Sequence, residues 1–211
     1  MKALILAGGD ITPTPALLTL CQTCTLVIAA DSGVRHAAAL GVVPDIIVGD
    51  FDSATEAQLA PYPEVPRRTH PVRKDALDLE LALNEATGRG AAELLIVGAL
   101  GGRLDQTLAA LLIAARYRNR YSAMLHSGHA AAYPLQSGDV LSLPLPPGTP
   151  FSVLSLGPVS TISLTGASYP LERATLAFGV GLGVSNEVVE TPLRVELHEG
   201  LALLLLDLGM S

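Results

Sequence analysis

The sequence predicts an α/β fold, with a Rossmann-like parallel-sheet domain over residues 1–128 and an all-β sandwich domain over residues 129–211. Two observations lead to this prediction. In the first half, short apolar runs alternate with segments of helical period, which is typical of βαβ units. Beyond residue 128 the helical period disappears, and short alternating runs bounded by Gly, Pro, Asn or Ser indicate antiparallel sheets.

The first half contains apolar runs that predict buried strands, most of them followed directly by glycine or aspartate. Strands are expected at residues 2–7, 25–30, 45–48, 94–97 and 122–126. Helices are expected to begin near Pro15, Gly33, Ser53, Lys74 and Leu104. Ser53 has capping-box spacing to Glu56, and the helix from Gly33 is expected to end at Leu40. The prolines between residues 61 and 71 predict an extended connection containing one edge strand.

The second half contains short runs with the period of β-strands. They are expected at residues 140–143, 151–156, 161–164, 175–178, 193–197 and 201–206. The polar outlier is Ser185-Asn186-Glu187, which follows the glycine-rich stretch 179–183. A hairpin connection explains these three residues without a function, and a ligand contact is the alternative.

The composition excludes several classes of protein. The formal net charge is −7 and the lysines and arginines are scattered, which argues against a nucleic-acid-binding surface. The fullest apolar stretches, 108–115 and 201–206, are shorter than the roughly 18 residues that span a bilayer, so no membrane association is expected. A strand begins directly after Met1, which leaves no room for a cleavable signal, and a cytoplasmic location is the default expectation. An acidic protein attracts cations, including positively charged small molecules.

The stretch Gly49-Asp50-Phe51-Asp52-Ser53 directly follows a predicted buried strand. It places two carboxylates one residue apart at the carboxyl end of that strand, where open parallel sheets bind ligands. Paired carboxylates repel each other unless a cation lies between them, and Mg²⁺ prefers oxygen ligands and substrate phosphates. A simple turn is the alternative, because aspartate is common in turns.

Other polar residues are predicted to lie at the same edge of the sheet. Asp31 and Asp105 follow two other strands, and Asp78 lies four residues after Lys74 at a predicted helix start. The turn before Asp105 contains Gly101, Gly102 and Arg103, and it offers backbone N–H groups and a cation to phosphates. Two structural alternatives remain: acids at a helix start also complement the helix dipole, and Arg103 can be an ordinary surface residue.

The cysteines and histidines give no clear sign of chemistry. Cys21 and Cys24 are interpreted as two ordinary thiols near a buried strand; a thioredoxin-like redox pair is the alternative, and no second ligand pair for zinc is found. The histidines show no convincing metal spacing; they are His36, His70, His126, His129 and His198.

The motifs described above occur in an order that resembles the bacterial thiamine pyrophosphokinase (thiamine diphosphokinase) family. The resemblance extends from the first strand nearly to the C-terminus. Each motif is short, and it is their joint order that is specific. The matching motifs are Gly49-Asp50-Phe51-Asp52-Ser53, Lys74-Asp75-x-x-Asp78-Leu79-Glu80-Leu81-Ala82, Gly101-Gly102-Arg103-Leu104-Asp105-Gln106, Leu164-Thr165-Gly166 with Tyr169-Pro170-Leu171, and Ser185-Asn186-Glu187.

The resemblance implies a homodimer that transfers pyrophosphate from ATP to thiamine and releases AMP. It implies that the first domain binds ATP and catalyses, and that the second contributes to thiamine binding and dimerisation. The acids implied to surround Mg²⁺ and the triphosphate are Asp50, Asp52, Asp78 and Asp105, with the first three as metal ligands. The ATP-binding residues are expected to be Asp31, Ser32, Lys74, Gly101, Gly102 and Arg103, with Asp31 on the ribose by analogy with dinucleotide folds. The thiamine-binding residues are expected to be Gln106, Ser185 and Asn186, in a pocket where two subunits meet.

The sequence departs from the family pattern at several positions. Bacterial relatives usually carry Thr at the position of Leu77, often His at that of Gln106, and commonly Asp and Asn near His126 and His129; this chain also has no Trp to stack on the vitamin. The metal acids are retained, so the departures concern the acceptor contacts. The alternative functions are pyrophosphoryl transfer to another alcohol such as a hydroxymethyl pterin, non-catalytic nucleotide or vitamin binding, and a thiol oxidoreductase built on the two cysteines.

Overall fold

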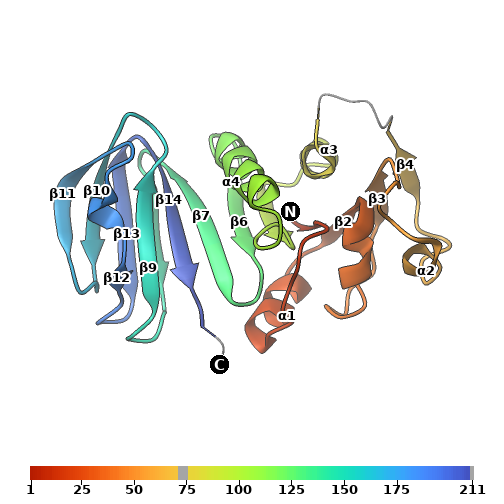
Figure 1. The fold of residues 1–211 in the computed structure, drawn as a ribbon, viewed down its shortest axis with the longest axis horizontal. Helices are drawn as coiled ribbons and strands as arrows, with labels where there is room; N and C mark the ends of the chain where they lie inside the picture. The colour runs from red at the N-terminus through yellow and green to blue at the C-terminus, as the bar shows by residue number, and fades with distance from the viewer. Residues whose placement is uncertain (71–75, 210–211) are drawn as a thin grey trace. The chain divides into compact units, whose positions relative to one another are not determined.

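The computed structural model describes residues 1–70 and 76–209, and the chain divides into two compact units (Figure 1). Unit 1 comprises Met1–Gly128 and unit 2 comprises His129–Ser211. Unit 1 has a parallel sheet with helices, and the described part of unit 2 has antiparallel strands and one short 3₁₀ helix, η2 (Gly181–Gly183). The predicted α/β class with a C-terminal β-sandwich is therefore confirmed.

The sheet of unit 1 is parallel throughout, in the strand order β6-β5-β1-β2-β3-β4. Its inner strands are nearly continuous apolar runs, as expected for a parallel sheet buried on both faces. The strands are β1 (Lys2–Leu6), β2 (Leu26–Ala30), β3 (Ile46–Gly49), β4 (Arg67–Thr69), β5 (Glu93–Val97) and β6 (Ser122–His126). The strand order reverses between β1 and β5, which is the point where such sheets bind ligands.

The helices of unit 1 are α1 (Pro15–Gln22), η1 (Asp31–His36), α2 (Glu56–Leu59), α3 (Asp78–Gly88) and α4 (Leu104–Tyr117). The prediction for 33–40 is wrong, because η1 is a short 3₁₀ helix that begins at the end of β2. The predicted cap at Ser53 is also wrong, since Thr55 is the N-cap of α2 and forms a capping box with Gln58. The predicted helix start at Lys74 lies outside the described residues, and α3 begins at Asp78.

Unit 2 has two antiparallel groups of strands, in the orders β12-β9-β14-β7 and β11-β10-β13-β8. Alternate residues of β10 and β13 are buried, as the period-2 pattern predicts. The strands are β7 (Ala130–Gln136), β8 (Val140–Leu143), β9 (Pro150–Ser155), β10 (Val159–Thr165), β11 (Leu171–Ala177), β12 (Asn186–Glu187), β13 (Leu193–Glu199) and β14 (Leu201–Asp207). The sequence pattern missed β7 and β12.

The longest helix in the described ranges is α4, with 14 residues. No helix among the described residues has both the length and the apolar character that a bilayer-crossing segment needs.

Candidate functional site

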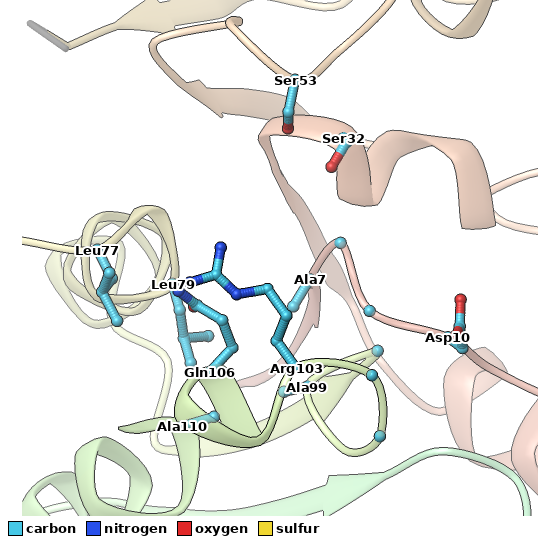
Figure 2. A pocket seen from close by; sticks show the side chains of 15 residues that line it. Ala7, Asp10, Ser32, Ser53, Leu77, Leu79, Ala99, Arg103, Gln106 and Ala110 are labelled. Atoms are coloured by element: carbon cyan, nitrogen blue, oxygen red, sulfur yellow. The ribbon is translucent and has the colours of Figure 1, made fainter. Parts of the chain in front are cut away.

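A cavity of about 420 Å³ lies at the carboxyl ends of β1 and β5, where the strand order reverses. Its volume is in the range of small-molecule sites. Figure 2 shows the side chains of Ser32 and Ser53 across the cavity from Arg103 and Gln106. The lining residues are those of 7–10 and 98–99, Gly101, Gly102, Arg103, Gln106 and Ala110, together with Ser32, Ser53, Leu77 and Leu79.

Glycines let the backbone segments around this cavity interlock. A Cβ at Gly9 would lie 2.5 Å from the Gly98 carbonyl oxygen, and a Cβ at Gly98, whose φ is +78°, would lie 2.4 Å from the Ala7 carbonyl oxygen. A Cβ at Gly8 would lie 2.5 Å from Ser32 Oγ. Backbone therefore forms this part of the cavity wall, and a ligand can approach peptide groups directly.

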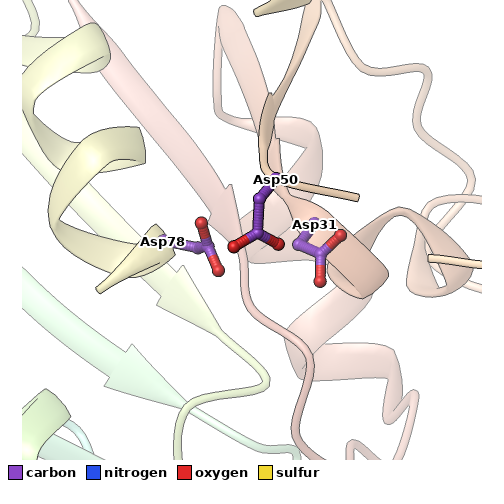
Figure 3. A group of neighbouring side chains, drawn as sticks. All are labelled: Asp31, Asp50 and Asp78. Atoms are coloured by element: carbon purple, nitrogen blue, oxygen red, sulfur yellow. The ribbon is translucent and has the colours of Figure 1, made fainter. Parts of the chain in front are cut away.

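Three carboxylates converge beside the cavity. Asp31, Asp50 and Asp78 each offer an oxygen within 4.8 Å of the others' oxygens, and we call them the acid group. In Figure 3, Asp50 lies between the other two. They come from the start of η1, the end of β3 and the start of α3. The cavity wall contains Ser32, Leu77 and Leu79, which are the sequence neighbours of Asp31 and Asp78, so the acid group and the cavity adjoin.

Local backbone geometry brings Asp31 and Asp50 together. Residue 49 is glycine, and a Cβ there would lie 3.0 Å from the Asp31 Cβ, so a larger residue would crowd the acid group. Asp31 has a φ of +47°, in the left-handed region that aspartate tolerates better than most residues. Ser53 Oγ donates to Asp31 Oδ2, whereas the buried Asp31 Oδ1 has no hydrogen-bond partner among residues 1–70 and 76–209. A buried carboxylate oxygen without a partner is unfavourable unless a cation or donor arrives.

Two of the predicted acids lie outside the acid group. Asp52 is exposed, its backbone N–H donates to Asp50 Oδ1 at 3.2 Å, and the Asp50 carboxylate raises its pKa. Asp105 forms a bidentate ion pair with Arg103, with an Nε–Oδ1 distance of 3.1 Å and an Nη2–Oδ2 distance of 2.6 Å. The hydrogen bonds from Arg103 lower the pKa of Asp105. Both side chains of this pair are mostly exposed.

The structure places most of the other predicted ligand-binding residues on the cavity wall. Ser32, Gly101, Gly102, Arg103 and Gln106 all line it. Gly101 and Gly102 have φ values of +88° and +82°, which glycine adopts readily, in the turn that leads into α4. Lys74 lies outside the described residues.

Ser185 and Asn186 lie in unit 2, on the wall of a second cavity of about 420 Å³. Asn186 is buried, its Oδ1 accepts from the Tyr169 N–H at 3.0 Å, and its Nδ2 donates to the Tyr169 carbonyl at 2.8 Å. Asn186 therefore holds the backbone of Tyr169, whose side chain is 69% exposed. Ser185 is exposed, and its N–H donates to Ser152 Oγ at 3.2 Å.

The two cysteines do not have the features of a redox site. Burial raises the pKa of Cys21 to about 11 and also raises that of Cys24. Reactive cysteines need a lowered pKa because the thiolate is the nucleophile. The interpretation of two ordinary thiols agrees with this environment.

Sequence reasoning missed the participation of Asp10 and Ser53 in the cavity wall. It placed Asp31 at the same edge of the sheet as Asp50 and Asp78 but did not include it among the metal ligands, and its role on a ribose stays a prediction. The signal for Asp31 was present, because it follows β2 as Asp50 follows β3. Neighbouring parallel strands carry such residues to the same edge. The sequence feature that could have indicated a place for Ser53 in the cavity wall is its position directly after Asp52.

Two family comparisons match most of the chain. Residues 17–125 match the family described as "Thiamin pyrophosphokinase, catalytic domain", and residues 141–202 match "Thiamin pyrophosphokinase, vitamin B1 binding domain". The chain belongs to the thiamin pyrophosphokinase family. The first match covers unit 1 except for residues at each end of that unit, and the second lies within unit 2.

Individual thiamin pyrophosphokinases are similar over nearly their full length. The Thiamine pyrophosphokinase of Bacillus subtilis (strain 168) is 27% identical over 192 residues, which is 89% of each chain. A crystal structure of Thiamine pyrophosphokinase from Bacillus subtilis has a TM-score of 0.86 at 23% identity, with both chains fully covered. A Thiamin pyrophosphokinase family protein from Enterococcus faecalis has a TM-score of 0.81 at 25% identity, again with full coverage of both chains.

Proposed function

We propose that this thiamin pyrophosphokinase family member transfers the pyrophosphoryl group of ATP to the hydroxyl group of thiamine, which yields thiamine diphosphate and AMP. The observation that carries the proposal is the glycine-walled cavity at the strand-order reversal, with the acid group beside it. Unit 1 would bind ATP and catalyse, and unit 2 would contribute to thiamine binding and dimerisation. These assignments agree with the catalytic and vitamin-binding family matches.

The acid group has the chemistry to hold a divalent cation such as Mg²⁺. One oxygen from each acid lies within 4.8 Å of the other two, and the buried Asp31 Oδ1 lacks a partner in the part of the chain that the structure describes. Asp31, Asp50 and Asp78 would hold the ion, with Asp52 close enough in sequence to Asp50 to act at the same edge. When bound, Mg²⁺ would neutralise charge on the polyphosphate. The acids without a cation repel one another, which favours its uptake.

ATP is proposed to occupy the cavity of unit 1. Gly101 and Gly102 line the cavity without side chains, so phosphate oxygens can approach their backbone, and α4 begins directly after this wall, with the positive end of its dipole. Arg103 would offset phosphate charge, and its ion pair with Asp105 would fix the direction of the guanidinium. Lys74 is proposed as a further phosphate contact on the family resemblance.

The reaction is an in-line displacement at the β-phosphorus. The thiamine hydroxyl oxygen forms a bond to this phosphorus, the bond from it to the oxygen shared with the α-phosphate breaks, and AMP leaves with that oxygen. The hydroxyl proton is released. Such transfers depend on positioning and on charge neutralisation more than on covalent chemistry by the protein. The glycine walls would contribute to the positioning, and the cation held by the acid group would supply the charge neutralisation together with Arg103.

The residues proposed to bind thiamine are Gln106, Ser185 and Asn186, as the family resemblance implies, and Tyr169. Thiamine carries a positive thiazolium ring, which suits a protein of net charge −7. No Trp is present, and the exposed Tyr169 ring provides the flat surface on which an aromatic or cationic ring can stack. Asn186 holds the Tyr169 backbone through two hydrogen bonds, so the point from which this ring projects is fixed before the ligand arrives.

Replacing Tyr169 with alanine is expected to raise the KM for thiamine by about fivefold, because stacking on an aromatic ring contributes on the order of 1 kcal/mol. Tyr169→Phe keeps the ring and is expected to stay within about twofold of the wild type on the same basis. Steady-state kinetics at saturating ATP measure both values. An unchanged KM in the alanine variant would remove Tyr169 from the thiamine site.

We also propose a cytoplasmic homodimer. The apolar residues Leu104, Leu108 and Leu112 repeat at helical spacing along α4, and all three are at least half exposed in the single chain. A second copy of the chain would remove such a stripe from water. Cys21 and Cys24 are free thiols despite their closeness in sequence, which suits a reducing compartment.

Product analysis tests the proposed function directly. The protein is mixed with MgATP and thiamine, and both products are identified by mass; thiamine diphosphate and AMP are expected in equal amounts. ADP in place of AMP would refute pyrophosphoryl transfer. Parallel reactions with a hydroxymethyl pterin separate the related transferase from the proposed one, and ATP binding without any product would indicate a binding protein.

A further inference from the structure

We infer that His36 is a positioning residue that sets the affinity for ATP by holding the Gly9 carbonyl at the cavity wall. This inference rests on the proposed function, because it takes ATP as the occupant of the cavity. His36 does not line the cavity itself. It acts through Gly9, which does.

The contact between the two residues is short and protected from water. His36 Nε2 lies 2.7 Å from the Gly9 carbonyl oxygen, and the His36 side chain is buried. A carbonyl can only accept, so Nε2 carries the proton and the imidazole donates. Burial lowers the pKa of His36, which agrees with a neutral ring in this tautomer.

The preceding residue supports the same segment. Arg35 Nη2 donates to the Gly9 carbonyl at 3.3 Å, and it also lies 3.5 Å from Asp10 Oδ1. Gly9 and Asp10 both line the cavity. Two consecutive side chains at the end of η1 therefore hold two consecutive residues of the wall.

The position of the Gly9 peptide matters because the wall is closely packed. Its N–H donates to the Gly98 carbonyl at 2.7 Å, so Gly9 joins the loop after β1 to the loop after β5. The same 3₁₀ helix that ends at His36 begins at Asp31 of the acid group. His36 thus links the phosphate-facing wall to the segment that supplies an acid.

The test compares two substitutions at one position. His36→Phe keeps a ring but removes the donor, and it is expected to weaken ATP binding by about three- to tenfold, the range for loss of one hydrogen bond. His36→Gln keeps an N–H donor and is expected to stay within about twofold of the wild type. If the phenyl ring prevents folding, His36→Met is a second donor-free variant with a flexible side chain.

The matched control is His129→Phe. His129 Nδ1 lies 2.7 Å from the Gly209 carbonyl oxygen, which is the same type of contact in unit 2, and His129 is not among the residues that line the ATP cavity. ATP affinity is expected to remain unchanged in this variant. Thermal unfolding of every variant shows whether a change in affinity comes with a loss of stability.

Calorimetric titration with ATP, in the absence of thiamine, gives the dissociation constants, and kinetics give KM and kcat. For His36→Phe the KM for ATP is expected to rise with little change in kcat. Equal ATP affinity in the wild type and His36→Phe, or equal weakening in the Phe and Gln variants, would overturn the inference. A wild-type protein that binds ATP, shows the expected variant pattern and yet forms no thiamine diphosphate would refute the proposed function alone.

Discussion

Replacing Asp50 with asparagine is expected to lower kcat by about 10²- to 10³-fold, the range observed when one group that stabilises transition-state charge is removed. Asp50 is the middle member of the acid group, and one of its oxygens lies within 4.8 Å of an oxygen of Asp31 and of an oxygen of Asp78. Asparagine has nearly the same shape and keeps an oxygen that can accept from the Asp52 N–H. The effect therefore reports the lost charge, as measured by thiamine diphosphate formation at saturating substrates.

The fold of Asp50→Asn is expected to be at least as stable as that of the wild type, because the substitution removes repulsion within the acid group. Glu64→Gln is the matched control, since it removes an exposed carboxylate elsewhere in unit 1 and is expected to leave turnover unchanged. The same change at Asp52 is expected to remove most turnover. Near wild-type turnover in Asp50→Asn would contradict the assignment of the acid group.

Replacing Gly33 with alanine is expected to destabilise the protein by about 3 kcal/mol, at the upper end for overpacking of a core. A Cβ at residue 33 would lie 2.0 Å from the Leu6 carbonyl oxygen and 2.6 Å from the Leu6 carbonyl carbon. Both atoms belong to the backbone of β1 and cannot rotate away. The segment η1 must then move, which displaces Asp31 and Ser32, so ATP binding is expected to weaken as well. Urea denaturation measures the change in the free energy of unfolding.

Gly88→Ala is the control for this substitution. Gly88 is the last residue of α3, and a Cβ there would meet no atom within 4 Å. Alanine in an open helical position is expected to raise the free energy of unfolding by about 0.4–1 kcal/mol, because it restricts the unfolded chain. Wild-type stability in Gly33→Ala would show that η1 and β1 are less tightly packed than the distances require.

The sequence was sufficient to predict which residues of unit 1 follow the carboxyl ends of its strands, because buried parallel strands are strongly apolar and their carboxyl ends meet at one edge of the sheet. It correctly placed Asp50 after β3 and Asp31 after β2. It could not predict that Asp105 pairs with Arg103, since a carboxylate can bind either a metal cation or a guanidinium group. The partner of a charged side chain depends on three-dimensional contacts that local patterns do not contain.

Unit 2 shows a second limit of sequence patterns. Strand β7 contains three alanines and Pro134, which are all uncommon in strands, yet it pairs along its length with the leucine-rich β14. Tertiary pairing overrides a weak local preference. Asn186 is similar, because its place after a glycine-rich stretch gives no indication of the two hydrogen bonds that tie its amide to the Tyr169 backbone.

The convergence of Asp31, Asp50 and Asp78 has a consequence for the evolution of this fold. Repulsion between carboxylates held this close lowers the free energy of unfolding, so packing in the remainder of unit 1 must offset it. Mutations that remove one of these charges would raise the stability of the protein and lower its catalytic activity. Selection for growth at higher temperature is therefore expected to act on the hydrophobic interior and the loops, and to leave these three positions untouched.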